Sequence, residues 1–282
     1  MSLISNSIAG FKQGFKFRRV AGYIFLIQLF LGLLIGFLGI NYVNSSIGSS
    51  TNLMKIIGGY NHDVFQDLLR FESTGWSMIK TFIWLVLLIY FFIGPFIMGG
   101  LLSSYHSGID QWNIFWRGGS QWYFPFLKLN LLIFLCLIMV LAILGVIGFF
   151  FTSYSLENML TEIPALIVIF GLIFLFILYI IHIVTISTKT KWAMIANADT
   201  SVWRLFRTSA KEVRGRFAYF IVLGLLFLIL TLIFGLLANS LINYVPESSF
   251  ILILLAFLMQ LLVLLFRVFL RNAYYATMLA EN

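Results

Sequence analysis

Six long apolar stretches organise this sequence. They cover residues 20–41, 81–105, 129–151, 164–188, 217–241 and 250–266. A hydrocarbon layer of roughly 30 Å requires about 20 apolar residues of helix. The apolar residues are continuous rather than alternating, and in lipid the backbone must satisfy its hydrogen bonds within each segment. The pattern therefore predicts an all-α integral membrane protein, a single polytopic domain over residues 1–282 with six transmembrane helices.

The polar segments between these stretches alternate in charge. Fifteen of the 18 Lys and Arg residues lie before the first stretch, between the second and third, between the fourth and fifth, or after the sixth. Basic residues collect on the cytoplasmic side of membrane proteins. Both termini are therefore predicted to be cytoplasmic, and residues 42–80 form the longest outer loop. Within that loop, residues 61–72 are predicted to form a short amphipathic helix that begins at Asn61.

The most basic segment, residues 199–219, has the pattern of an amphipathic surface helix. Val202, Leu205, Phe206 and Val213 fall on one face of a helix. Four basic residues follow the spacing i, i+3, i+7 and i+10 along another face: Arg204, Arg207, Lys211 and Arg214. We expect this stripe to contact anionic lipid headgroups.

Two further segments, residues 5–23 and 110–123, resemble this one. Each of the three contains an aromatic residue three positions before a small one: Phe11 and Gly14, Trp116 and Gly119, Phe206 and Ser209. One interpretation is three parallel repeats, each a surface helix followed by two spans. The other is that basic flanks and aromatic residues at the membrane interface produce the likeness without common origin.

Arg267 and Arg271 follow the sixth apolar stretch, one helical turn apart. Two interpretations are open: they clamp a lipid phosphate together with the stripe at residues 204–214, or they only extend to the headgroups. The candidate lipid-headgroup contacts are thus Arg204, Arg207, Lys211, Arg214, Arg267 and Arg271.

The six stretches themselves contain no Asp, Glu, Lys or Arg, and His182 is their one ionisable side chain apart from tyrosine and Cys136. A packing role is favoured for His182 over proton transfer. Four amides are expected to form hydrogen bonds between helices: Gln28, Asn130, Asn239 and Gln260. The pair Gly94-Pro95 predicts a kink in the second span.

The sequence shows no constellation typical of catalysis or metal binding. It lacks a glycine-rich phosphate loop, a serine nucleophile elbow, an HExxH motif and a CxxC pair, and Cys136 is the only cysteine. We therefore predict no catalytic, cofactor-binding or metal-binding residues and no enzymatic activity. The net charge of +8 comes from basic runs beside apolar spans, which favours anionic lipid over nucleic acid as the partner.

Several short motifs carry a resemblance to known membrane proteins. They are Pro95-Phe-Ile-Met-Gly-Gly100, Phe115-Trp-Arg-Gly-Gly119, Trp192-Ala-Met-Ile-Ala196 and Ser201-Val-Trp-Arg-Leu-Phe-Arg-Thr-Ser209. The chain resembles a loose group of six-span bacterial integral membrane proteins of unknown function. This group includes the membrane domain of some glycerophosphodiester phosphodiesterases. The resemblance implies the fold and a location in the bacterial inner membrane, and it carries over no catalytic residue.

Two functions agree with these observations. The first is a non-enzymatic, membrane-organising or accessory protein that contacts anionic lipid and partner membrane proteins. The alternative is a transporter or lipid translocator with a cavity between helix repeats. An enzyme acting on lipids is less favoured, because it would need acids or histidines that converge at one interface.

Overall fold

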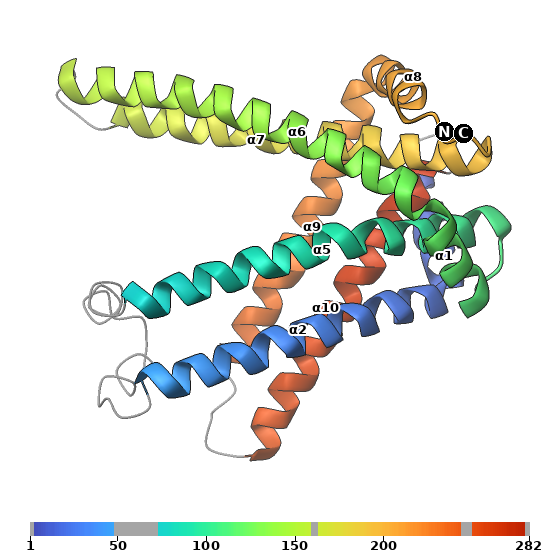
Figure 1. The fold of residues 1–282 in the computed structure, drawn as a ribbon, viewed down its shortest axis with the longest axis horizontal. Helices are drawn as coiled ribbons and strands as arrows, with labels where there is room; N and C mark the ends of the chain where they lie inside the picture. The colour runs from blue at the N-terminus through green and yellow to red at the C-terminus, as the bar shows by residue number, and fades with distance from the viewer. Residues whose placement is uncertain (1–2, 48–72, 159–162, 244–249, 280–282) are drawn as a thin grey trace. The chain divides into compact units, whose positions relative to one another are not determined.

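The computed structural model describes residues 3–47, 73–158, 163–243 and 250–279. Every regular element in these ranges is an α-helix (Figure 1), which confirms the predicted all-helical class. The helices are α1 (Leu3–Lys16), α2 (Arg18–Ile47), α5 (Ser73–Ser107), α6 (Trp112–Asn158), α7 (Ile163–Ala196), α8 (Val202–Gly215), α9 (Phe217–Asn243) and α10 (Phe250–Leu279). The predicted helix at residues 61–72 lies outside the described residues.

Five of the described helices contain a stretch that is long and apolar enough to cross a membrane. These stretches are Thr81–Ser107, Trp112–Ser153, Ile163–Ala196, Phe217–Ser240 and Leu254–Leu279. The segments Ser7–Lys16 and Arg18–Leu34 meet at a bend of 77° and add a sixth if they count as one span. The structure therefore supports a multi-pass membrane protein.

The helices extend beyond the apolar stretches that predicted them. The fourth stretch ends at residue 188, but α7 continues to Ala196 and contains Lys189 and Lys191. The sixth ends at residue 266, but α10 continues to Leu279 through Arg267 and Arg271. Lys and Arg are good helix formers, so a charge ends an apolar run without ending a helix. The assignment of Lys189 and Lys191 to a loop therefore needs correction.

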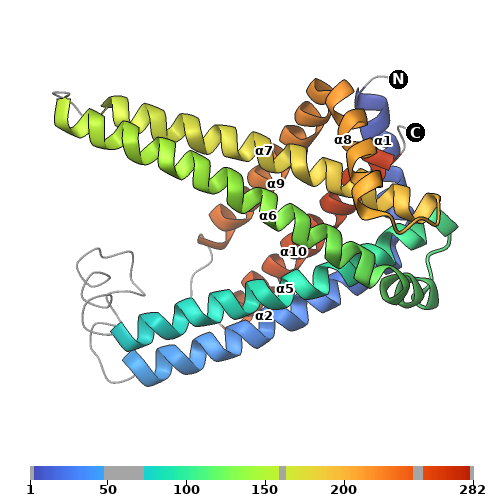
Figure 2. The ribbon, with the colours of Figure 1, turned by 45° about the horizontal axis from the view of Figure 1, so that its top comes forward.

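The chain divides into two compact units. The smaller one, Tyr23–Gly94, contains most of α2 and the first part of α5, which run side by side (Figures 1 and 2). Nε2 of Gln28 donates a hydrogen bond to the hydroxyl of Tyr90 at 3.2 Å. This confirms the predicted interhelical role of Gln28. The boundary between the units falls just before Pro95, through which α5 continues as helix.

The larger unit, Met1–Gly22 with Pro95–Asn282, is packed through small residues. Helix α1 lies on α10, where a methyl group at Gly10 would stand 2.8 Å from the carbonyl oxygen of Ala273. The start of α6 lies equally close to α5, where a methyl group at Gly100 would stand 2.6 Å from the carbonyl oxygen of Phe115. Small residues let helix backbones approach closely, which is how helices associate in a membrane.

Candidate functional site

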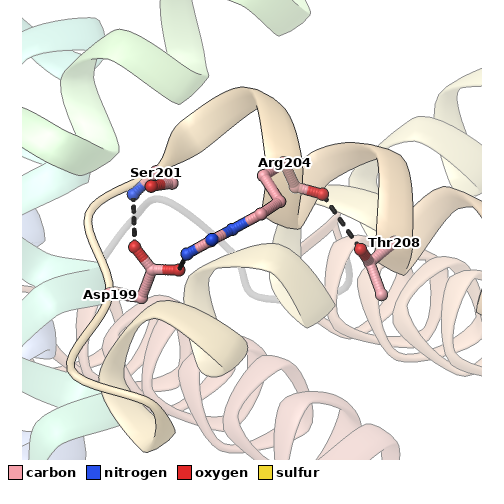
Figure 3. Close-up of polar contacts among 4 residues, drawn as sticks. All are labelled: Asp199, Ser201, Arg204 and Thr208. Atoms are coloured by element: carbon pink, nitrogen blue, oxygen red, sulfur yellow. Dashed lines mark hydrogen bonds and ion pairs between the residues drawn. The ribbon is translucent and has the colours of Figure 1, made fainter.

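Helix α8 starts with a local network around Asp199 (Figure 3). One oxygen of the Asp199 carboxylate accepts a hydrogen bond from the backbone N–H of Ser201 at 2.9 Å, and the other pairs with the guanidinium of Arg204. The N–H of Ser201, and after it Arg204, hold the pKa of this carboxyl below its usual value. A carboxylate before the first turn satisfies a free N–H and favours the helix start.

Helix α8 presents different residues on its two sides. The side that is covered consists of Leu205, Ser209 and Val213. The exposed side carries the four predicted bases, Arg204, Arg207, Lys211 and Arg214. Trp203, next to them, is 65% exposed. Among the described residues Asp199 pairs with Arg204 alone of these four bases, which leaves Arg207, Lys211 and Arg214 available to an external anion.

An ion pair between a buried lysine and an exposed glutamate joins α8 to its main neighbour, α7. Nζ of Lys189 lies 3.1 Å from Oε1 of Glu212. The Lys189 side chain is only 3% exposed, whereas that of Glu212 is 46% exposed. The Lys189 ammonium also lies 5.6 Å from the ring centroid of Phe220 on α9. This lysine, expected in a cytoplasmic loop, therefore joins three helices.

Lys191, two residues further along α7, is also buried. Its ammonium donates a hydrogen bond to Oδ1 of Asn130 on α6 at 2.8 Å and lies 5.8 Å from the ring centroid of Phe126. Within the described residues no carboxylate pairs with it. Asn130 therefore forms a hydrogen bond between helices, as predicted. Its donor is Lys191, which the sequence pattern assigned to a cytoplasmic loop.

The other two candidate bases lie away from α8. Arg271 is half-buried on α10, next to the fully buried Asn272, whose carbonyl accepts a hydrogen bond from the hydroxyl of Tyr105 at 3.2 Å. Arg267 is exposed and lies against Gly235 of α9. The six candidate residues thus occupy two places, the exposed side of α8 and one turn in the second half of α10.

His182 lies on α7 with its ring at 5.1 Å from the ring of Phe217. Close by, the hydroxyl groups of Thr185 and Tyr274 are 3.2 Å apart and join α7 to α10. In the described ranges no three His, Cys, Asp or Glu residues come together. The His182 ring thus makes an aromatic contact between α7 and α9, and its packing role stays a prediction.

One polar contact escaped the sequence analysis. The carboxylate of Asp110, in the turn before α6, accepts hydrogen bonds from the backbone N–H groups of Arg19 at 3.0 Å and Val20 at 2.9 Å. It therefore caps the first turn of α2, where free N–H groups favour a negative charge. The residues are about 90 positions apart in the chain, so no local signal could have revealed the cap.

Comparison with known protein families, with curated proteins and with solved structures yields no match for this chain.

Proposed function

We propose that this chain is a non-enzymatic, multi-pass protein of the bacterial inner membrane with both termini in the cytoplasm. Its exposed face on α8 would hold anionic lipid headgroups and thereby organise lipid or partner membrane proteins around the helices. The observation that supports this most directly is the two-sidedness of α8: its bases are exposed while Leu205, Ser209 and Val213 are covered.

The strength of this contact follows from charge and position. Each basic side chain near an anionic membrane surface contributes about 1 kcal/mol. Arg204 contributes less, because it already pairs with Asp199. The ion pair between Lys189 and Glu212 holds α8 in place, so little ordering cost accompanies lipid binding. The exposed indole of Trp203 is suited to the headgroup boundary.

The test replaces Arg204, Arg207, Lys211 and Arg214 together with Gln and measures retained phosphatidylglycerol by native mass spectrometry. Retention should fall by at least about tenfold and lose its dependence on salt. A matched variant with Lys at the three arginines keeps the charge and should keep most of the lipid. Unchanged retention in the neutral variant would contradict the proposal.

A second candidate, transport or lipid translocation through a cavity between helix repeats, is supported by a recurring contact. Helix α1 packs on α10, the start of α6 on α5, and α8 on α7. The small residues of the three similar segments, Gly14, Gly119 and Ser209, are buried in these helices. Three parallel repeats would produce such likeness. Proteoliposomes that fail to move a fluorescent phospholipid between leaflets would count against this candidate.

A further inference from the structure

Arg267 occupies an unusual position on α10. With 1.5 Å of rise per residue, it lies about 18 Å from Leu279 at one end of the helix and about 26 Å from Phe250 at the other. It belongs to the stretch Leu254–Leu279, which is apolar enough to cross a membrane. Arg267 therefore lies within the length of a candidate span rather than beyond its end.

The residue beside Arg267 on the neighbouring helix, Gly235, also lies within an apolar stretch, Phe217–Ser240 of α9. The ring of Phe227 contacts that of Tyr274 with centroids at 5.4 Å, and the ring of Phe234 contacts that of Phe266 at 4.0 Å. Positions rise on α9 as they fall on α10, so the two helices are antiparallel. Gly235, beside Arg267, lies about 27 Å from the start of α9 and about 12 Å from its end.

The guanidinium of Arg267 rests on a site without a side chain. A methyl group at Gly235 would stand 2.8 Å from Nη2 of Arg267 and 3.9 Å from its Cζ. Within the described residues no carboxylate pairs with this exposed arginine. An arginine at the centre of a membrane helix costs about 2.5–3.5 kcal/mol on insertion scales, and such residues usually mark a ligand or an ion path.

Further polar residues lie along the contact between α9 and α10, which we call the seam. On α10, Gln260 precedes Arg267 by seven positions and Arg271 follows it by four, which places all three on one side of the helix. On α9, Asn239 follows Gly235 by four positions and so lies on the same side as that glycine. A line of hydrogen-bonding groups therefore follows the pair of helices in an otherwise apolar region.

We propose that Arg267, seated against Gly235, binds the charged headgroup of an anionic amphiphile that enters between α9 and α10 from the lipid. The headgroup carries a phosphate or a carboxylate, since a guanidinium donates two parallel hydrogen bonds to either. The acyl chain lies along the apolar surface of the two helices. This site is separate from the bases of α8 and does not rest on their contact with lipid.

The test titrates the full-length purified protein with phosphatidylglycerol, with oleate and with uncharged monoolein, and follows binding by native mass spectrometry. Arg267→Gln should lower the affinity for the anionic probe by at least about tenfold, the factor expected for one lost charge-assisted hydrogen bond. Gly235→Ala should lower this affinity several-fold, because the added methyl group displaces the flexible guanidinium end of Arg267 and no other described atom within 4 Å. The matched control is Gly145→Ala, because nothing lies within 4 Å of the added methyl group.

The outcomes separate the possible ligands. Loss of phosphatidylglycerol binding in both variants assigns the site to a lipid phosphate, and loss of oleate binding assigns it to a carboxylate. Monoolein binding should be unaffected. Unchanged affinity for both anionic probes in Arg267→Gln and Gly235→Ala would overturn the proposal. The titrations are repeated in the Gln variant of α8, so that phosphatidylglycerol held by α8 does not mask binding at the seam. In the α8 test the Arg267→Gln background removes lipid held at Arg267, so the two proposals fail independently.

Discussion

The two ends of the helices in the larger unit differ in what surrounds them. At one end, Phe115 and Met194 are fully buried by other helices. Toward the other end, Phe150 and Phe170 are each 67% exposed and Leu236 is 68% exposed. Lipid tails are as apolar as these side chains, so lipid stabilises the exposed parts without specifying how they pack. The packed end must therefore carry most of the information that determines the fold.

Two buried polar contacts lie at the packed end. They are the ion pair of Lys189 with Glu212 and the hydrogen bond of Lys191 with Asn130. A buried polar group that loses its partner is costly, whereas a methylene added to a lipid-facing surface is not. Substitutions at the two ends should therefore differ strongly in effect.

The largest effect is expected for Gly100→Leu. The first carbon of the new side chain would meet the backbone oxygen of Phe115 at 2.6 Å, and backbone cannot rotate away. We expect a loss of about 2–3 kcal/mol, typical of overpacking, measured as a lower apparent melting temperature of the solubilised protein.

Gly145→Leu on α6 is the matched substitution in the lipid-facing part. Nothing lies within 4 Å of a carbon added there, so its melting temperature should change little. Equal destabilisation by Gly100→Leu and Gly145→Leu would show that the two ends do not differ as described.

The second effect is that of Glu212→Ala. It leaves the buried ammonium of Lys189 without its carboxylate. Breaking a fully buried pair costs 3–5 kcal/mol, but Glu212 is partly exposed, so we expect about 1–2 kcal/mol. Chemical labelling of Lys189 should also increase as α8 loosens. A labelling rate equal to that of the unaltered protein would rule out this role for the pair.

Part of this architecture could be predicted from the sequence. Continuous apolar runs identified an all-helical protein with helices long enough to cross a membrane. Of the four apolar residues expected on one face of α8, Leu205 and Val213 are buried, while Val202 and Phe206 are half-buried. The prediction failed at the helix ends. An apolar run stops at the first charge, so Lys189 and Lys191 were assigned to a cytoplasmic loop although α7 contains both. The sixth helix, by contrast, was expected to continue past Arg267, as α10 does.

The contacts between segments distant in the chain could not be predicted from the sequence, for a different reason. The cap of Asp110 on α2 and the packing of Gly10 against Ala273 depend on which helices become neighbours. The second basic segment, expected as a separate surface helix, is continuous with α6 from Trp112. The membrane orientation and the three-repeat interpretation stay predictions.

The third effect should have the opposite sign. Lys191→Met replaces a buried ammonium, held by one amide oxygen and an aromatic ring, with an apolar side chain of similar length. Because desolvation of a buried charge often exceeds its favourable contacts, we expect a gain of about 1 kcal/mol. A lower melting temperature would mean that the hydrogen bond to Asn130 outweighs desolvation. Asn130→Leu combined with Lys191→Met tests this, since together they should be at least as stable as the single variant.

The smallest effect concerns the exposed start of α8 and depends on pH. The pKa of Asp199 is lowered in the folded protein, first by the N–H of Ser201 and then by Arg204. Its contribution is therefore present above the pKa of an unfolded aspartate, about 3.9, and is lost as pH falls through the lower folded value. A spin label at Trp203→Cys, an exposed position in the first turn, in a Cys136→Ser background, should become more mobile only as pH falls below the ordinary aspartate pKa of about 3.9. Asp199→Asn should show that mobility already at pH 7, because the amide no longer pairs with Arg204. Mobility that is independent of pH in the unaltered helix would mean that the buried side of α8 alone holds its first turn. The exposed ion pair of Asp199 with Arg204 would then not stabilise the start of the helix.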